Sequence, residues 1–143
     1  MRDVINLVEA NSSTVYYHVT FASRVPKIKK QGLLVGRKRN WEQVFGDKQG
    51  STKHLYLMTD FTPAVRWAFK MQWDFKRDIA IIVIDDFSGE VMPDDHPENW
   101  IRGEGAWVMT AENIPPQYIS RVIPLTNELS RQVAQTGRAS LPD

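Results

Sequence analysis

Three side chains on three predicted strands have the types needed to break the bond between a sugar and a flat ring. They are His18, Tyr56 and Glu104. A carboxylate such as Glu104 can stabilise positive charge that develops on a sugar carbon, and it can orient the attacking group. An aromatic ring such as Tyr56 can hold a flat cationic ring by stacking. These residue types are compatible with chemistry related to glycoside cleavage.

Alternation of side chains indicates how the strands position these residues. On the first predicted strand His18 and Thr20 share one face, and on the second Tyr56 lies opposite Leu57. The apolar run 79–84 is typical of a central strand buried on both faces. The predicted strands cover residues 14–20, 54–59, 79–84, 104–110 and 118–125, the last at a sheet edge because of Pro124.

Three helices are predicted, over residues 24–31, 63–73 and 127–135. Ser23 and Thr62 are the predicted N-caps, and Gly32 is the predicted end of the first helix. In the second helix the residues expected to face the core are Ala64, Val65, Ala68, Phe69 and Trp73, with Trp67 and Met71 off this stripe. Strands outnumber helices, so the predicted class is α+β. Residues 36–53 are predicted to form a long loop.

The 143 residues predict one domain over 1–135, followed by a flexible C-terminal tail over 136–143. The absence of cysteine excludes disulfides, thiolate metal sites and a cysteine nucleophile. No apolar stretch is long enough to predict a membrane span, and the first residues do not resemble a signal peptide. We therefore expect a cytoplasmic protein with no membrane partner.

The net charge of +1 argues against a dedicated nucleic-acid binder, although the charges are unevenly distributed. Residues 19–41 contain no acid, and their bases are Arg24, Lys27, Lys29, Lys30, Arg37, Lys38 and Arg39. Such a segment can attract phosphates, or it can be a solvated helix face and loop. The acids and histidine at Asp85, Asp86, Asp94, Asp95 and His96 do not have the spacing of an EF-hand, so no metal is expected.

The order of these parts resembles the ADP-ribosyltransferase superfamily, in the diphtheria-toxin-like branch with a His-Tyr-Glu triad. The matching segments are His18-Val19-Thr20, Gly32-Leu33, Leu55-Tyr56-Leu57, Ala64 to Ala68, Glu104 and Ile114-Pro115-Pro116. The resemblance spans most of the chain, and its specificity lies in the ordered set of motifs. It implies a split β-sandwich with flanking short helices.

The resemblance also implies a role for each residue in binding NAD+. His18 would contact the adenosine ribose, Tyr56 would stack on nicotinamide, and Glu104 would contact the nicotinamide ribose. The main chain of Val19 would hold the carboxamide, and Thr20 would support the adenosine ribose or the neighbouring backbone. Trp67 or Phe69 would close the other side of the ring, and Arg24, Arg37 and Arg39 would steady the pyrophosphate. Glu112 is the alternative carboxylate if Glu104 is not the catalytic one.

The function implied is transfer of ADP-ribose from NAD+ to a protein or nucleic acid, with release of nicotinamide and without a metal. The small size suits a bacterial or bacteriophage effector, acting in its own or a host cytoplasm. Two alternatives stay open. One is an NAD+-using enzyme like RNA 2′-phosphotransferase, favoured by the basic segment. The other is an inactive binding module that contacts a partner through residues 36–53.

Overall fold

The computed structural model describes residues 14–36, 54–93 and 107–142. The strands are β1 (Val15–Phe21), β2 (Leu55–Met58), β3 (Ile79–Asp85), β4 (Met92–Pro93), β5 (Trp107–Thr110) and β6 (Ile119–Pro124). The helices are α2 (Val25–Gln31), α4 (Phe61–Phe75) and α6 (Asn127–Thr136), with short 3-10 turns η1 (Ala22–Arg24) and η2 (Pro116–Tyr118). Every strand pair is antiparallel, so the predicted α+β class is confirmed.

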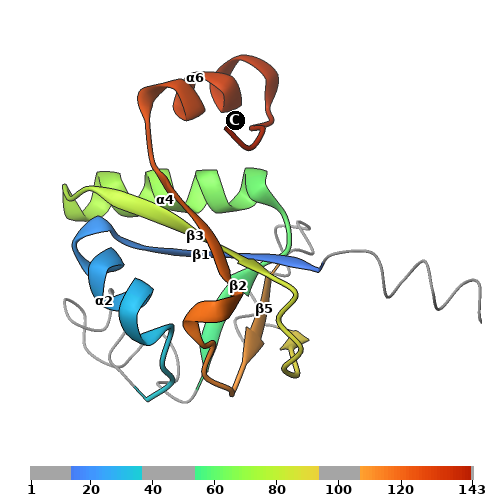
Figure 1. The fold of residues 1–143 in the computed structure, drawn as a ribbon. Helices are drawn as coiled ribbons and strands as arrows, with labels where there is room; N and C mark the ends of the chain where they lie inside the picture. Colours follow the sequence, from blue (N-terminus) through green and yellow to red (C-terminus); the bar gives the residue numbers. More distant parts are fainter. Residues whose placement is uncertain (1–13, 37–53, 94–106, 143) are drawn as a thin grey trace, which may run out of the picture.

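The sheet has the strand order β4-β5-β2-β1-β3-β6 and consists of two halves. β1 and β3 pair along their whole length, from Val15↔Asp85 to Phe21↔Ile79. By contrast, the ladder between β1 and β2 consists of Tyr17↔Met58 within the described residues. β2 and β5 consequently run at a steep angle to β1 and β3 (Figure 1).

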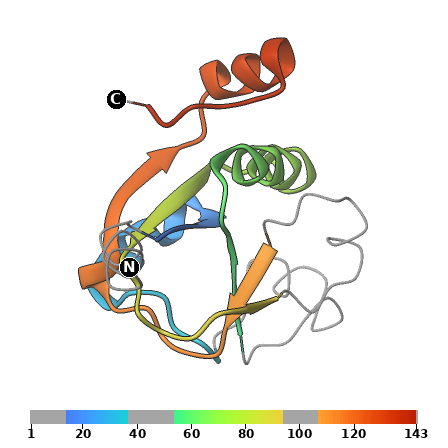
Figure 2. The ribbon, with the colours of Figure 1, turned by 90° about the vertical axis from the view of Figure 1, so that its right-hand side faces the viewer.

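Buried side chains form one cluster on each face of the sheet, and a different helix covers each face. α4 and α2 lie on opposite sides of β1 and β3, and α6 lies beyond α4 (Figures 1 and 2). The α4-side cluster includes Tyr17, Val19, Phe21, Ala64, Ala68 and Ile81, and the α2-side cluster includes Tyr16, Ile28, Leu57, Ile82, Ile84 and Ile114. β3 contributes to both clusters and lies between β1 and β6, which confirms the prediction of a central strand.

The apolar stripe of α4 differs from the predicted one. Trp73, expected to face the core, is 75% exposed, whereas Met71, expected off the stripe, is buried. The helix buries Ala64, Ala68 and Met71, which follow each other at spacings of four and three residues. Trp73 is nine residues from Ala64, so at ~100° per residue it projects from the opposite side of the helix.

Two predicted N-caps were also wrong. α2 begins after Arg24 without a side-chain cap, and the Ser23 hydroxyl instead accepts a hydrogen bond from Arg77. α4 begins after Asp60, so Thr62 lies inside its first turn and bonds to the main chain of Ala139. The predicted end of α2 at Gly32, the edge position of β6 and the helix near residues 127–135 are confirmed.

The residues after α6 pack back onto the domain. The Ala139 main chain bonds to Thr62, Arg66 donates to the Gly137 oxygen, and Arg121 donates to the Pro142 oxygen. These contacts hold the segment near α4 and β6; the predicted flexibility of the tail stays a prediction. Within the three described ranges, no helix has both the length and the apolar character required to cross a membrane.

Replacing Tyr17 with phenylalanine is expected to reduce the loss of stability at alkaline pH. Burial, followed by the nearby Asp85 and Asp60, raises the pKa of Tyr17 above 10.0. The folded state therefore keeps the proton longer than the unfolded state, and this stability is lost as pH rises from the unfolded pKa through the folded one. Denaturant unfolding from about pH 8 to 11 should show a shallower decline for Tyr17→Phe. Parallel declines would assign the alkaline loss to other groups.

Candidate functional site

The junction between β1 and β2 brings together two of the three predicted triad residues. His18 Nδ1 donates a hydrogen bond to the main-chain oxygen of Tyr56, with 3.0 Å between the two atoms. Because a carbonyl oxygen only accepts hydrogen bonds, Nδ1 must carry the proton in this contact. In the neutral ring the lone pair is then on Nε2, which can accept a hydrogen bond from a hydroxyl group.

The contact connects a side chain to a main chain, not two side chains. His18 lies on the α2-side face with Tyr16, opposite Ile82 of β3. Tyr56 lies on the other face of β2 from Leu57, which belongs to the α2-side cluster. Both His18 and Tyr56 are half-buried, and their side chains lie on different faces of the sheet.

Aromatic and methionine side chains, of which Met109 and Trp107 are buried, lie beside Tyr56 on the α4-side face of β2 and β5. Tyr56 is directly opposite Met109 of β5, and Met109 is opposite Met92 of β4. Trp107, the first residue of β5, meets Trp67 of α4 edge to face, with 5.6 Å between ring centroids. Such side chains suit contact with a flat apolar or cationic ring. Trp67 packs partly against the α4-side cluster and is half-buried, so it combines a core contact with exposed surface.

Val19 and Thr20 are enclosed by the sheet. Val19 is 5% exposed and Thr20 is 1% exposed, opposite Ile81 and Ala80 in the ladder with β3. Side chains this deeply buried do not reach a ligand themselves. They can influence ligand binding by fixing the backbone of the strand. Of the roles that the sequence predicted for Thr20, support of neighbouring backbone fits this burial.

Arg24 lies at the start of α2, close to Arg77, an arginine that no sequence motif indicates. Burial, followed by repulsion from Arg77, lowers the pKa of Arg24. Arg77 donates from Nη2 to the Ser23 hydroxyl at 2.9 Å, and its guanidinium carbon lies 3.8 Å from the centroid of the Phe21 ring. Sequence offered no signal for this pairing, since Arg77 and Ser23 are 54 positions apart.

Of the two candidate carboxylates, Glu112 lies within the described residues and Glu104 does not. Glu104 lies outside the described residues, as do Arg37, Arg39 and most of the predicted loop at 36–53; Glu104 precedes β5, which is the neighbour of β2. Glu112 follows the far end of β5, where its carboxylate accepts a hydrogen bond from the main-chain nitrogen of Glu90 at 2.8 Å. Glu112 thus has a structural partner just after the C-terminal end of β5.

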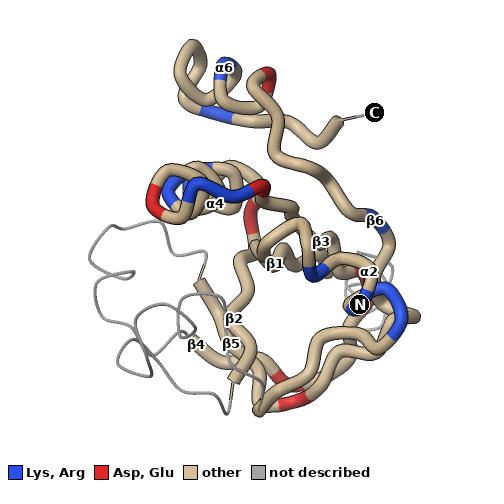
Figure 3. The backbone as a smooth tube through the Cα atoms, turned by 90° about the vertical axis from the view of Figure 1, so that its left-hand side faces the viewer, with Lys and Arg blue, Asp and Glu red and all other residues tan. Residues whose placement is uncertain are grey.

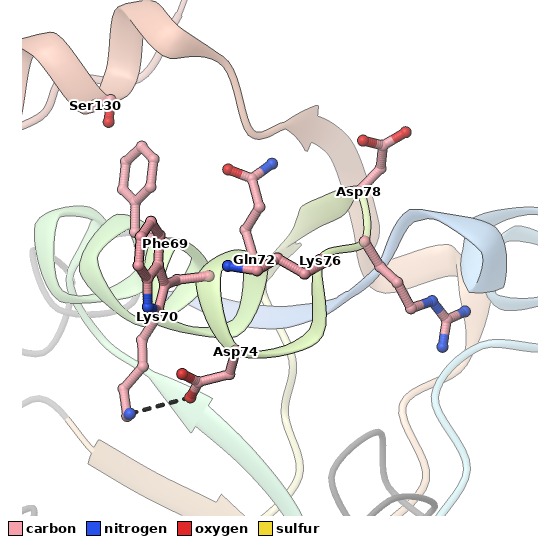
Figure 4. Close-up of a pocket in the computed structure, with 9 residues that line it drawn as sticks. Phe69, Lys70, Gln72, Asp74, Lys76, Asp78 and Ser130 are labelled. Carbon is pink, nitrogen blue, oxygen red and sulfur yellow. Dashed lines mark hydrogen bonds and ion pairs between the residues drawn. The ribbon is translucent and has the colours of Figure 1, made fainter.

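An open surface pocket of about 860 Å³ lies elsewhere, along the C-terminal half of α4 and the residues after it, with Ser130 of α6 on its other side (Figure 4). The Phe69 ring extends toward Ser130 of α6, and Gln72 and Lys76 line the same space. Of the predicted site residues that the structure describes, Phe69, the alternative to Trp67, lines this pocket. In the described ranges no three histidine or acidic side chains cluster in a way that could hold a metal ion.

Comparison with known proteins adds no further support. The sequence matches no model of a protein family, and a search of curated proteins finds no match. Any function must therefore be argued from the residues and contacts described above.

Proposed function

We propose that the protein is an NAD+-dependent ADP-ribosyltransferase acting in the cytoplasm of a bacterial or host cell. The observation that carries this proposal is the hydrogen bond from His18 Nδ1 to the Tyr56 main chain. It joins two residues of the expected triad that are 38 positions apart in the sequence. With its proton on Nδ1, the neutral His18 ring carries its lone pair on Nε2. In the proposed complex this nitrogen accepts a hydrogen bond from a ribose hydroxyl.

The surroundings of Tyr56 support a role in binding nicotinamide. The half-buried Tyr56 stands opposite Met109, near the paired rings of Trp67 and Trp107. The nicotinamide ring of NAD+ is flat and cationic, so stacking on tyrosine gains both apolar burial and cation–π attraction. The sheet in two halves, joined at Tyr17↔Met58, likewise supports the proposed split β-sandwich of the superfamily.

The proposed reaction transfers the ADP-ribosyl group from nitrogen to a nucleophile on the acceptor. The bond between the ribose C1′ atom and the nicotinamide nitrogen breaks, and nicotinamide leaves with the electron pair as a neutral molecule. The acceptor nucleophile forms a new bond to C1′ and gives its proton to Glu104 or to solvent. A carboxylate at this position also stabilises the oxocarbenium-like transition state.

The experiment that tests this function is incubation of the protein and a cell lysate with NAD+ labelled in its adenylate part. Labelling of a macromolecule, together with release of free nicotinamide, supports the proposal. If RNA with an internal 2′-phosphate loses that phosphate instead, the phosphotransferase alternative is correct. Absence of NAD+ binding, with stoichiometric capture of one partner, would support the inactive binding module.

Substitutions at the junction should separate contacts to NAD+ from contacts within the sheet. His18→Asn places an amide where it can still donate to the Tyr56 oxygen, but it removes Nε2. We expect a KM for NAD+ about tenfold higher and nearly unchanged thermal stability, because one hydrogen bond to the ligand is lost. Tyr56→Ala should also raise KM about tenfold, and Tyr56→Phe, which keeps the ring, should stay near the wild type. An equal loss of stability and activity in His18→Asn would indicate a purely structural histidine.

A further inference from the structure

The C-terminal end of α4 carries an exposed indole beside a cation. Trp73 is 75% exposed, and Lys76 Nζ lies 3.9 Å from the centroid of its ring. Of the described residues, it is the most exposed large hydrophobic side chain, and the core does not need it. Trp73 also lines the open pocket along α4 that faces α6. An exposed indole at the edge of such a pocket can stack on a flat ring from solution.

Bases continue from this indole toward α2. Lys76 is followed by Arg77, which bonds to Ser23 and lies close enough to Arg24 to affect its pKa. Lys27 is one helical turn beyond Arg24, and it is exposed. We call the set Lys76, Arg77, Arg24 and Lys27 the basic stripe. Blue segments in Figure 3 mark lysines and arginines on α2 and α4. Within the basic stripe, Lys27 lies in α2, Arg24 in η1, and Lys76 and Arg77 directly after α4.

The acids near the basic stripe do not neutralise its positive charge. Asp74 is 3.1 Å from Lys70, so these two charges pair with each other. Asp78 remains as an exposed acid beside the stripe. α2 itself contains three lysines and no acid. The guanidinium of Arg77 has five N–H donors, so its bond to Ser23 leaves others for a phosphate.

We propose that this surface binds single-stranded nucleic acid, with a base stacked on Trp73 and backbone phosphates along the basic stripe. Stacking platforms beside cationic tracks are how proteins hold single strands, and the bases of a duplex do not offer a free face for stacking. The binding proposal is independent of the NAD+ chemistry. If both are correct, the bound strand is the substrate class that receives ADP-ribose.

The test is fluorescence anisotropy of the full chain with labelled single strands of about 12 nucleotides, one of deoxythymidine and one of uridine, so that DNA and RNA are separated. We expect saturable binding to at least one strand and weaker binding to a duplex. Affinity should fall as salt rises, because phosphate contacts release counterions. Trp73→Ala should lower affinity about tenfold without changing thermal stability, and Trp73→Phe should largely keep it.

Charge variants complete the test. Lys76→Ala or Arg77→Ala should weaken binding and reduce the slope of log affinity against log salt by roughly one. The matched control is Arg131→Ala, on the exposed side of α6 and paired with Glu128, which should bind like the wild type. The proposal would be overturned if neither single strand bound, or if wild type and Trp73→Ala bound with equal affinity. The nicotinamide-release assay is scored separately, so failure of one proposal does not hide the other.

Discussion

A Glu104→Gln variant is expected to bind NAD+ with nearly unchanged affinity while nicotinamide release falls about a hundredfold. The substitution keeps the size and hydrogen-bonding capacity of the side chain but removes its negative charge. That charge matters most when the ribose becomes oxocarbenium-like, so turnover suffers more than ground-state binding. The measurement is steady-state nicotinamide release, with NAD+ affinity determined separately by calorimetry.

The matched comparison is Glu112→Gln. The Glu112 carboxylate is held by the Glu90 main chain beyond the far end of β5, and we expect this variant to change stability modestly and turnover little. If Glu112→Gln instead abolished turnover while Glu104→Gln did not, the catalytic carboxylate would be Glu112. If neither lowered turnover, a carboxylate-assisted mechanism would be excluded.

A Gly32→Ala variant is expected to lose about 3 kcal/mol of stability, or roughly 10 °C in Tm. Gly32 has φ +80°, a conformation that residues with a Cβ rarely adopt. A Cβ built there would lie 2.2 Å from the main-chain oxygen of Ile114. That oxygen accepts the hydrogen bond of Leu33 at 2.9 Å, so the clash would separate α2 from the segment after β5.

Gly137→Ala provides the control for this effect. Gly137 also has positive φ, at +76°, but a Cβ there would meet no atom within 4 Å. The loss should therefore be about 1 kcal/mol, from backbone conformation alone. Chemical denaturation of both variants separates the conformational cost from the steric one. Equal losses in the two variants would contradict a close backbone approach at Gly32.

Features that depend on neighbouring residues in the sequence could be predicted. Alternation placed His18 and Thr20 on one face of β1, and the apolar run at Ile79 predicted that β3 is an interior strand, which lies between β1 and β6. Gly32 ended α2 because few other residues adopt its backbone conformation. These are short-range effects of side-chain size and backbone freedom, and they require no knowledge of the fold.

Features that depend on contacts between distant segments could not be predicted. The position of Trp73 was wrong because its spacing from Ala64 places it on the opposite side of the helix. The proximity of Arg77 to Arg24 arises only when the end of α4 reaches the start of α2. The sequence predicted that His18 and Tyr56 belong to one site. It could not predict that His18 bonds to the main-chain oxygen of Tyr56, because this contact depends on how β1 and β2 diverge.

The most direct test of the central claim is an NMR titration of the labelled protein with NAD+, following the backbone amides. NAD+ bound at the junction of β1 and β2 should produce saturable shifts of the Val19 and Tyr56 amides and of the His18 ring, and His18→Asn should weaken them. Shifts confined to the region of Trp73, or no shifts at millimolar NAD+, would contradict the assignment of this junction as the site of NAD+ binding.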